Sequence, residues 1–366
     1  MITLSEKIGG RAISVETGRM ARQASGSVVV RYGDTVVLVT ATADKHEKRN
    51  LGFTPLAVHY VEKMYAAGRV PGGFFKREGR LSDRETLISR FIDRPIRPML
   101  PEGWNFETQI VATVLSTDHE NEPAVAAMLG ASAALQVSDI PIPGPLAGVR
   151  VGRVDGQFIA NPTPAERERS DLDLFVVATE DAILMVEGEA KEVSEAVALD
   201  AIMFAHETVQ PLIALQNKLA QKAGKAKRPK PVVELDKKLV AAVEKFAKAK
   251  LSKALTIQEK QERYAALDAL KDEVVAKFYN PAQDDAAVGK QAGDAYGELK
   301  KRVMREGVLK SGQRVDGRSP TDIREITCET SVLPRTHGSA LFTRGETQAL
   351  VTVTLGSRDD EQLIDA

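Results

Sequence analysis

Short apolar runs separated by turn residues mark the first third of the chain. Residues 28–30 and 36–39 are rich in valine and flank Gly33-Asp34. Valine-rich runs on either side of a two-residue Gly/Asp turn are typical of a β-hairpin. Further strands are predicted at residues 110–115, 175–178 and 183–186. Because these runs are apolar at both alternating positions, we expect a sheet that is covered on both faces.

A helix is predicted beside these strands, from Ala124 to Val137. This small-residue apolar stretch is shorter than the ~20 residues that a membrane span requires. Ser132 and Gln136 also interrupt it. We therefore interpret it as a buried helix that covers one face of the sheet. Strands and helices mixed in this way predict a layered α/β or α+β fold and no membrane partner.

A second helix is predicted to begin at Ser82. Ser82 and Glu85 have the spacing of a Ser-x-x-Glu capping box. The side chains expected to face the core are Leu87, Ile88, Phe91 and Ile92. The arginines on the other side are Arg84, Arg90 and Arg94. Pro95 is expected to end this helix, because a proline disfavours helical geometry in the residue before it.

After Glu192 the strand pattern ends, and apolar residues recur at helical spacing over long segments. Helices are predicted over residues 192–219, 236–251, 257–279 and 284–304. The basic segment 222–231 contains glycine and proline and lacks apolar periodicity, so we interpret it as a linker. The apolar residues expected in a helical core are Leu239, Val243, Phe246, Tyr264, Leu267, Leu270, Val274 and Phe278. The lysines and glutamates of these helices are interpreted as solvated faces.

The pattern of the first hairpin occurs again near the end of the chain. Residues 26–42 and 338–354 are identical at eight of seventeen positions, including the glycine of each turn. With a shift of one residue, 13–17 also matches 326–330. Two unrelated hairpins would share valine and glycine but not the whole string. We interpret the match as a duplicated domain.

Four segments follow from these patterns. They are a first core at 1–220, a basic linker at 221–232, a helical domain at 233–308 and the start of a second core at 309–366. The second core is expected to begin near Gly312 and to stop at Ala366, after too few strands to close a core of its own.

Composition narrows the function only slightly. The 366 residues, 43% of them hydrophobic, are too many for one ordinary core. A net charge of −1 gives no global basic field, so nucleic-acid binding requires a local patch. The single cysteine, Cys328, excludes an intrachain disulfide framework, and we expect it to be buried. Glu6 and Lys7 replace the apolar run of a secretory signal, which predicts a cytoplasmic location.

A local basic patch follows the paired glycines Gly72-Gly73. Seven basic and four acidic residues lie between Lys76 and Arg97. Phe74 and Phe75 are adjacent on a predicted loop and cannot both face one core. Exposed rings can stack on RNA bases without sequence preference. The cations that would then neutralise neighbouring phosphates are Lys76, Arg77 and Arg80.

Other roles for these charges stay open. One phenylalanine could anchor the loop while the arginines pair with the nearby acids, Glu78, Asp83, Glu85 and Asp93. The guanidinium groups that are candidates for additional contacts to RNA or phosphate are those of Arg90, Arg94 and Arg97.

Three strings in this chain resemble the bacterial polynucleotide phosphorylases, phosphate-dependent 3′-to-5′ exoribonucleases. Residues 333–348 resemble the start of that family's second core. Residues 71–80 and 92–98 resemble its first-core RNA-contact loop and the segment that follows. The resemblance extends along the whole chain. It implies a ribonuclease-PH-like βαβα core, a homotrimeric ring of six cores, and single-stranded RNA threaded along the central channel.

The resemblance also implies cofactors and further partners. The family uses inorganic phosphate as co-substrate and Mg²⁺ or Mn²⁺, with the phosphate loop and acidic ligands in the second core. In this chain those elements would lie beyond Ala366, as would the family's KH and S1 domains. RNA-degradosome proteins are further partners that the resemblance implies.

The first copy departs from the catalytic pattern. Where the family's second core has a serine-rich, phosphate-binding turn, this copy has Glu122-Pro-Ala124. Glutamate repels phosphate, and proline lacks an amide donor. Asp171 and Asp173 match the family's acidic pair, but the expected lysine is replaced near Val186-Glu-Gly188. We interpret the first copy as degenerate, with the two aspartates structural rather than metal ligands.

These interpretations predict that residues 1–366 alone are inactive and contain no catalytic residue or metal ligand. Two other functions stay open: a non-catalytic RNA-binding ring subunit, and a metabolic enzyme whose arginines bind a small polyanion. The pair Phe74-Phe75 argues against the polyanion enzyme. A serine-rich loop beyond Ala366 would separate the exoribonuclease from the ring subunit.

Overall fold

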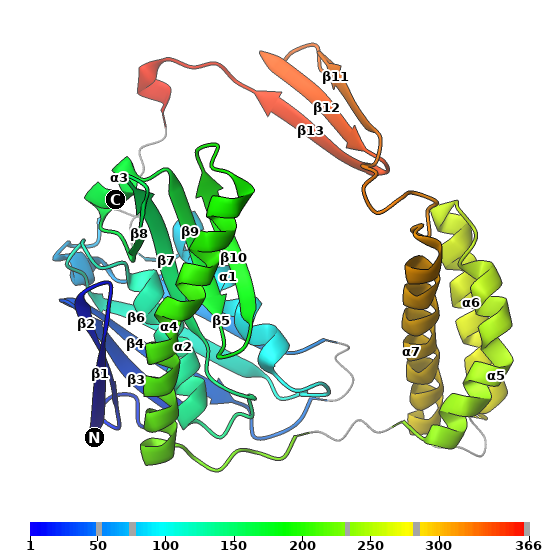
Figure 1. The fold of residues 1–366 in the computed structure, drawn as a ribbon, viewed down its shortest axis with the longest axis horizontal. Helices are drawn as coiled ribbons and strands as arrows, with labels where there is room; N and C mark the ends of the chain where they lie inside the picture. The colour runs from blue at the N-terminus through cyan, green and yellow to red at the C-terminus, as the bar shows by residue number, and fades with distance from the viewer. Residues whose placement is uncertain (49–52, 73–77, 231–234, 281–285, 362–366) are drawn as a thin grey trace. The chain divides into compact units, whose positions relative to one another are not determined.

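The computed structural model describes residues 1–48, 53–72, 78–230, 235–280 and 286–361. The chain divides into two compact units, Met1–Val233 and Glu234–Ala366. Figure 1 shows mixed strands and helices in the first unit and a helical bundle with a small sheet in the second.

Two sheets and four helices form the described part of the first unit. The larger sheet has the order β1-β2-β3-β4-β6-β5 and the smaller sheet the order β10-β9-β7-β8. Its strands are β1 (Ile2–Ile8), β2 (Arg11–Thr17), β3 (Gly26–Tyr32), β4 (Thr35–Ala43), β5 (Leu56–Glu62), β6 (Thr108–Ser116), β7 (Ala147–Val154), β8 (Gln157–Ala160), β9 (Leu172–Ala178) and β10 (Ile183–Ala190). Its helices are α1 (Asp83–Ile96), α2 (Pro123–Val137), α3 (Pro164–Arg169) and α4 (Glu195–Ala223), with short 3₁₀ turns at Met64–Ala67 and Arg97–Met99.

Helix α2 packs against strands of both sheets. All of its residues are buried, and it contacts β3, β4 and β6 on one side and β7 and α4 on the other. Gly130 allows a close approach, because a Cβ atom there would lie 2.5 Å from a methyl group of Val39. The predicted buried helix is therefore confirmed. In the described part of the chain, no helix is both long and apolar enough to cross a membrane.

The predicted hairpin is confirmed as β3 and β4, and the other predicted strands are confirmed as β6, β9 and β10. Val28 pairs with Val39 across the hairpin. Gly33 has a φ of +60°, in the left-handed region that glycine adopts at little cost.

The prediction that the sheet is covered on both faces holds only in part. Val37 and Val39 are fully buried beneath α2, whereas Val36 on the opposite face is half-buried.

Helix α1 has the predicted start but not the predicted end or inner face. Ser82 and Glu85 form the reciprocal capping box. Pro95 lies inside the helix, which continues to Ile96, so the predicted end was wrong. A proline in the last turn removes only one amide donor, and the Pro95 side chain is buried. Leu87 is 52% exposed, so its predicted inward position was also wrong. The buried stripe is Glu85, Ile88, Ser89, Ile92, Pro95 and Ile96.

In the described part of the second unit, three helices come first: α5 (Lys237–Ala254), α6 (Lys260–Phe278) and α7 (Ala286–Ser311). Val243, Leu267 and Val274 are buried in their shared core, as predicted. Tyr264 was predicted to join them but is 49% exposed. Its neighbour Arg263 takes the buried position, donating hydrogen bonds to the carbonyls that close the α5–α6 turn.

The second copy of the hairpin follows as β11 (Ile326–Thr330), β12 (Gly338–Arg344) and β13 (Thr347–Val353), with a short 3₁₀ turn at Arg358–Asp360. Ala340 pairs with Val351, as Val28 pairs with Val39 in the first copy. The connection before the hairpin is one residue shorter in the second copy, which accounts for the shift of one residue in the repeat.

Cys328 lies on β11 and is exposed, so its predicted burial was wrong. Among the described residues, no helix covers this sheet as α2 covers the first.

Candidate functional site

The predicted RNA-contact loop is described only at its end. Phe74, Phe75, Lys76 and Arg77 lie outside the described residues. Arg80 is exposed beside them, and Arg90 is exposed on α1. Within the part of the chain that the structure describes, neither arginine forms an ion pair. Both stay predicted contacts to RNA.

Arg94 and Arg97 differ from these two because each already has protein partners. Arg94 is exposed and pairs with Glu187 on β10. The guanidinium of Arg97 binds Asp93 at 2.6 Å and donates to the carbonyls of Thr54 and Leu56 at 2.9 and 3.0 Å. These bonds join the end of α1 to the start of β5. A phosphate at Arg97 would have to displace them.

Two of the acids near the loop bind groups other than arginine. Glu78 binds the Lys63 ammonium at 2.9 Å and accepts the amide of Met64 at 2.7 Å. The Met64 amide and Lys63 lower the pKa of Glu78. Glu85 accepts amides from Ser82 and Glu62. Among the described residues, Asp93 is the one of these four acids that pairs with an arginine.

The N-terminus of α2 carries a carboxylate where the family would place a phosphate-binding turn. Glu122 is the N-cap residue, but its side chain makes no capping hydrogen bond. It faces Arg150 on β7 instead. Arg150 Nε lies 2.6 Å from Glu122 Oε2, and Nη2 lies 3.0 Å from Oε1. Arg167 on α3 adds a longer contact of 3.7 Å to the same carboxylate.

Asp173 on β9 completes this arrangement. Arg150 Nη1 lies 2.7 Å from both carboxylate oxygens of Asp173, and Arg167 Nε lies 3.7 Å from one of them. Glu122 and Arg150 are each only 14% exposed at the side chain. Partly buried charges are stable when paired with opposite charges, and here two guanidinium groups balance two carboxylates. We call these four residues the Arg150 cluster.

The second aspartate of the predicted acidic pair has its own arginine. Asp171 Oδ2 lies 2.8 Å from Arg153 Nη1. Within the described residues, no group of three or more His, Cys, Asp or Glu side chains could hold a metal ion. Because Arg153 and Arg150 neutralise Asp171 and Asp173, a divalent cation would have to displace a guanidinium group. The residues present here therefore do not fit a divalent cation.

The loop before Glu122 is fixed by Asp118. Its carboxylate accepts hydrogen bonds from the amides of Asp34, Glu120 and Asn121 at 2.8–2.9 Å and from the Thr35 hydroxyl at 3.0 Å. Burial opposes ionisation of Asp118, but these hydrogen bonds outweigh it and hold the pKa well below the ordinary aspartate value. The hairpin turn thereby sets the position of the turn that carries Glu122.

The C-terminus of α2 has a partner that the sequence patterns did not reveal. Lys227 Nζ donates to the carbonyls of Leu135, Gln136 and Ser138 at 2.7, 3.0 and 2.8 Å. Burial lowers the pKa of this ammonium to about 8. Arg228 pairs with Asp139 at 2.8 Å. Part of the predicted basic linker is therefore attached to the first unit, where it caps α2. Basic groups favour helix C-termini, but spacing alone could not show which helix they reach.

Comparison with protein families assigns most of the chain. The model described as 3′ exoribonuclease family, domain 1, matches residues 9–141 and again residues 322–365. The model for domain 2 of that family matches residues 144–208. The chain belongs to the 3′ exoribonuclease family. The two matches to domain 1 confirm the duplication. The model described as polyribonucleotide nucleotidyltransferase, RNA binding domain, matches residues 238–319.

Curated relatives in the 3′ exoribonuclease family match the whole chain. Polyribonucleotide nucleotidyltransferase of Geotalea uraniireducens (strain Rf4) is 54% identical over 360 residues, which are 98% of this chain and 51% of the relative. The same-named protein of Citrifermentans bemidjiense is 52% identical over 364 residues, which are 100% of this chain and 52% of the relative. The chain spans about half the length of the curated relatives that it matches.

Among solved structures, the crystal structure of rice (Oryza sativa) Rrp46 aligns with a TM-score of 0.48 and 16% identity, covering 59% of this chain and 96% of that chain. The family assignment confirms the predicted α/β fold class and the resemblance stated above.

Proposed function

We propose that this chain is the N-terminal half of a phosphorolytic 3′-to-5′ exoribonuclease. The whole enzyme would use inorganic phosphate to release nucleoside diphosphates from single-stranded RNA and could run in reverse to polymerise them. Identity of 50–54% along the chain to proteins named polyribonucleotide nucleotidyltransferase supports this activity. Mg²⁺ or Mn²⁺ would supply charge neutralisation at the transferring phosphoryl group. Its ligands would lie outside this chain.

We also propose that the first copy holds RNA and does not cleave it. The observation that carries this proposal is the Arg150 cluster. A helix N-terminus with nearby guanidinium groups is a favourable place for an anion. In this copy the Glu122 carboxylate already lies 2.6 Å from Arg150 Nε and 3.0 Å from Arg150 Nη2. A phosphate arriving there would meet the negative charges of Glu122 and Asp173. Phosphorolysis would then depend on the second copy in the longer protein.

The remaining organisation follows from the family. We propose that 1–220 is the first core, 221–232 the connecting segment, 233–308 the helical domain and 309–366 the start of the second core. The longer protein would form a homotrimer in the cytoplasm and meet RNA-degradosome proteins. Residues 1–366 alone would not need to trimerise, because they would lack half of each contact surface of the ring. Exposed apolar side chains should follow, and Leu350 is 57% and Val353 48% exposed. A stable trimer of residues 1–366 in sedimentation would contradict this.

Replacing Asp171 tests whether the first copy is degenerate. Asp171→Asn in the longer protein should leave the rate of phosphate-dependent diphosphate release within about twofold of the parent, because the pair with Arg153 is half-exposed and contributes little. Glu180→Gln, at an exposed acid on the neighbouring connection, is the matched control. A loss of 100-fold or more in Asp171→Asn alone would make this aspartate a catalytic or metal-binding residue.

The RNA-contact loop has its own test. Phe74→Ala combined with Phe75→Ala should weaken binding of poly(A) and poly(U) alike, by roughly 1–3 kcal/mol for each lost base contact. Long RNA should be digested less processively, whereas short oligonucleotides should be little affected. Lys76→Ala with Arg77→Ala should flatten the salt dependence by about 0.7 in the log–log slope for each lost phosphate contact. Unchanged digestion of both long and short RNA by the double phenylalanine variant would place the RNA path elsewhere.

A further inference from the structure

The outer face of helix α4 carries large apolar side chains that the first unit does not bury. Its inner face packs on β1, β7 and β9 and buries Ala201, Ala205 and Val209. On the opposite side, Leu199 is 59% exposed and Met203 is 47% exposed. Figure 1 shows α4 in the foreground of the first unit. Because Leu199 and Met203 are one helical turn apart, they form a single apolar surface.

Acidic residues border this apolar surface. Asp200 and Glu207 are exposed and fall on the same side of the helix, because successive residues are related by about 100°. From Glu192 to Asn217 the chain has four acidic residues and no lysine or arginine, although its basic and acidic residues nearly balance overall, at 50 and 51. Among the described residues, neither Asp200 nor Glu207 forms an ion pair. We define the α4 stripe as the exposed residues Ala196, Leu199, Asp200, Met203 and Glu207.

The helix dipole does not account for the acids of the α4 stripe. A carboxylate in the first turn stabilises the N-terminus of a helix, which explains Glu195. That effect fades beyond the first turn, and Asp200 and Glu207 lie further along the helix. Exposed acids beside exposed apolar side chains instead match an amphipathic helix of opposite charge, which binds through its apolar side and is oriented by its charges.

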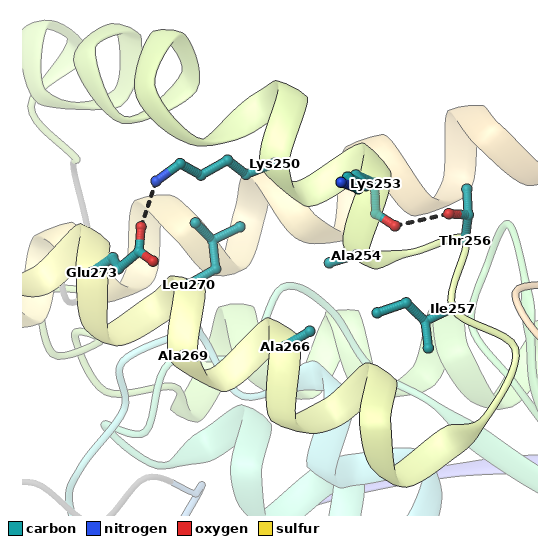
Figure 2. Close-up of a pocket in the computed structure, with 9 residues that line it drawn as sticks. All are labelled: Lys250, Lys253, Ala254, Thr256, Ile257, Ala266, Ala269, Leu270 and Glu273. Atoms are coloured by element: carbon teal, nitrogen blue, oxygen red, sulfur yellow. Dashed lines mark hydrogen bonds and ion pairs between the residues drawn. The ribbon is translucent and has the colours of Figure 1, made fainter.

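A partly apolar surface in the second unit has the opposite charge. A groove of about 430 Å³ runs where α5 meets α6, and its lining includes Ala254, Leu270, Lys250 and Lys253 (Figure 2). Helix α5 carries six lysines against one glutamate. A polyanion such as RNA would be attracted to lysines of this kind and repelled by the α4 stripe. The α4 stripe therefore suits a different class of partner.

We propose that the α4 stripe is a docking surface for a basic amphipathic helix of a partner protein. Leu199 and Met203 would contact the apolar side of the partner helix. Asp200 and Glu207 would pair with lysines or arginines at its edges. The same acids disfavour RNA and anionic lipid, which leaves protein as the class of partner. The proposal adds a partner to the proposed function and does not depend on RNA binding or on catalysis.

Charge reversal on the α4 stripe tests the electrostatic part. The probe is a fluorescein-labelled peptide of roughly 18 residues, about 27 Å long as a helix, with leucines along one side and lysines beside them. Asp200→Lys with Glu207→Lys in residues 1–366 should weaken its binding at least roughly tenfold and remove the weakening that added salt causes in the parent.

The matched control for charge is Glu102→Lys with Glu168→Lys. Both acids are exposed in the first unit, and the change in net charge is the same. We expect this control to change the affinity for the peptide by no more than about twofold at physiological salt, because exposed charges further than a Debye length away are screened.

Leu199→Ala with Met203→Ala tests the apolar part. Alanine favours the helix but removes contact area, so peptide binding should weaken by roughly tenfold or more while its salt dependence stays unchanged. The matched control is Met304→Ala with Leu309→Ala, at exposed side chains of α7, and it should bind the peptide as the parent does. Far-UV circular dichroism and the thermal midpoint of the first unit would show that α4 remains folded.

Several results of these titrations would overturn the proposal. If the parent binds the peptide no more tightly than a peptide of the same composition in shuffled order, the α4 stripe does not recognise an amphipathic helix. Equal weakening by the stripe variants and by their controls would indicate a diffuse acidic field. Self-association of the parent in sedimentation, abolished by the stripe variants, would mean that a second copy of this chain covers the stripe. Loss of oligo(A) binding in the stripe variants but not in the controls would make RNA its occupant.

Discussion

The two copies of the duplicated hairpin have the same strand pairing but opposite burial. Val39 in β4 and Val351 in β13 occupy the same position in the repeat and in the register. Val39 is fully buried beneath α2, whereas Val351 is 48% exposed. Local sequence is therefore enough to form the hairpin, because alternation and a turn glycine occur in both copies. Burial depends on a helix that lies more than eighty residues further along the chain.

The turn glycines of the two hairpins have the same backbone conformation but different neighbours. Gly33 and Gly345 both have a φ of +60°. A Cβ atom at Gly33 would lie 2.4 Å from Asn121 Nδ2 and 2.6 Å from Asp118 Oδ2, which belong to the loop before α2. At Gly345 the nearest atom is the flexible Arg324 side chain at 3.0 Å. The segment after each hairpin, and not the hairpin itself, makes the first copy a packed domain.

The largest effect is expected from a charge placed beneath α2. Val39→Asp in residues 1–366 should destabilise the first unit by more than about 5 kcal/mol, because it buries an unpaired carboxylate. Val351→Asp at the equivalent exposed position should cost no more than about 0.5 kcal/mol. Urea unfolding followed by hydrogen exchange of β3 and β12 would measure both. Equal losses would mean that the second hairpin is buried in solution.

Removing Arg150 tests the Arg150 cluster, which lies at the N-terminus of α2 where an anion would otherwise bind. Arg150→Met leaves Glu122 and Asp173 without their main partner and should destabilise the first unit by about 3–5 kcal/mol. Adding Glu122→Gln should recover part of this loss, because one of the two unpaired charges is then gone. Chemical denaturation of the single and double variants gives both values. A single variant as stable as the parent would contradict the ion-pair account of this cluster.

Replacing each turn glycine with alanine tests the same difference between the two hairpins, with a smaller expected loss of stability. Gly345→Ala should cost about 1 kcal/mol from the left-handed backbone alone. Gly33→Ala should cost more, about 2–3 kcal/mol, because the new methyl group also displaces the Asp118 loop. Thermal unfolding monitored separately for each unit would rank the two. The reverse order would show that the Asp118 loop does not pack on the first turn in solution.

The smallest effect is the dependence on pH that Asp118 gives to the first copy. The pKa of Asp118 is lower in the folded protein than in the unfolded chain, so below the ordinary aspartate pKa of about 3.9 the unfolded state binds more protons. The stability that Asp118 contributes is complete above that pH and is lost as the pH falls. Asp118→Asn should therefore destabilise the first unit at pH 7 and flatten its loss of stability toward pH 2. An acid profile unchanged by Asp118→Asn would contradict this role.

Local patterns predicted the elements better than they predicted which residues are buried. The hairpin, the duplicated strands and the capping box at Ser82 depend on residues within a few positions of one another. Leu87 and Cys328 were placed wrongly because their burial depends on distant elements: the packing of α1 on its sheet, and the missing cover over β11 among the described residues.

The candidate site shows the same limit. The sequence indicated that Glu122 is incompatible with phosphate, and the resemblance to the family pointed to the acidic pair Asp171 and Asp173. The sequence could not show that Arg150, 28 positions after Glu122, joins Glu122 to Asp173. Strand pairing between β7 and β9 brings Arg150 near Asp173, and the packing of α2 brings Glu122 to both.

We propose that the first copy holds RNA and that catalysis belongs to the longer protein. The most direct measurement is release of ADP from poly(A), with inorganic phosphate and Mg²⁺, by residues 1–366 and by the longer protein, each purified from a host that lacks its own exoribonuclease of this kind. We expect phosphate-dependent release by the longer protein and none by residues 1–366, which should still bind the RNA. Phosphate-dependent ADP release by residues 1–366 alone would contradict it.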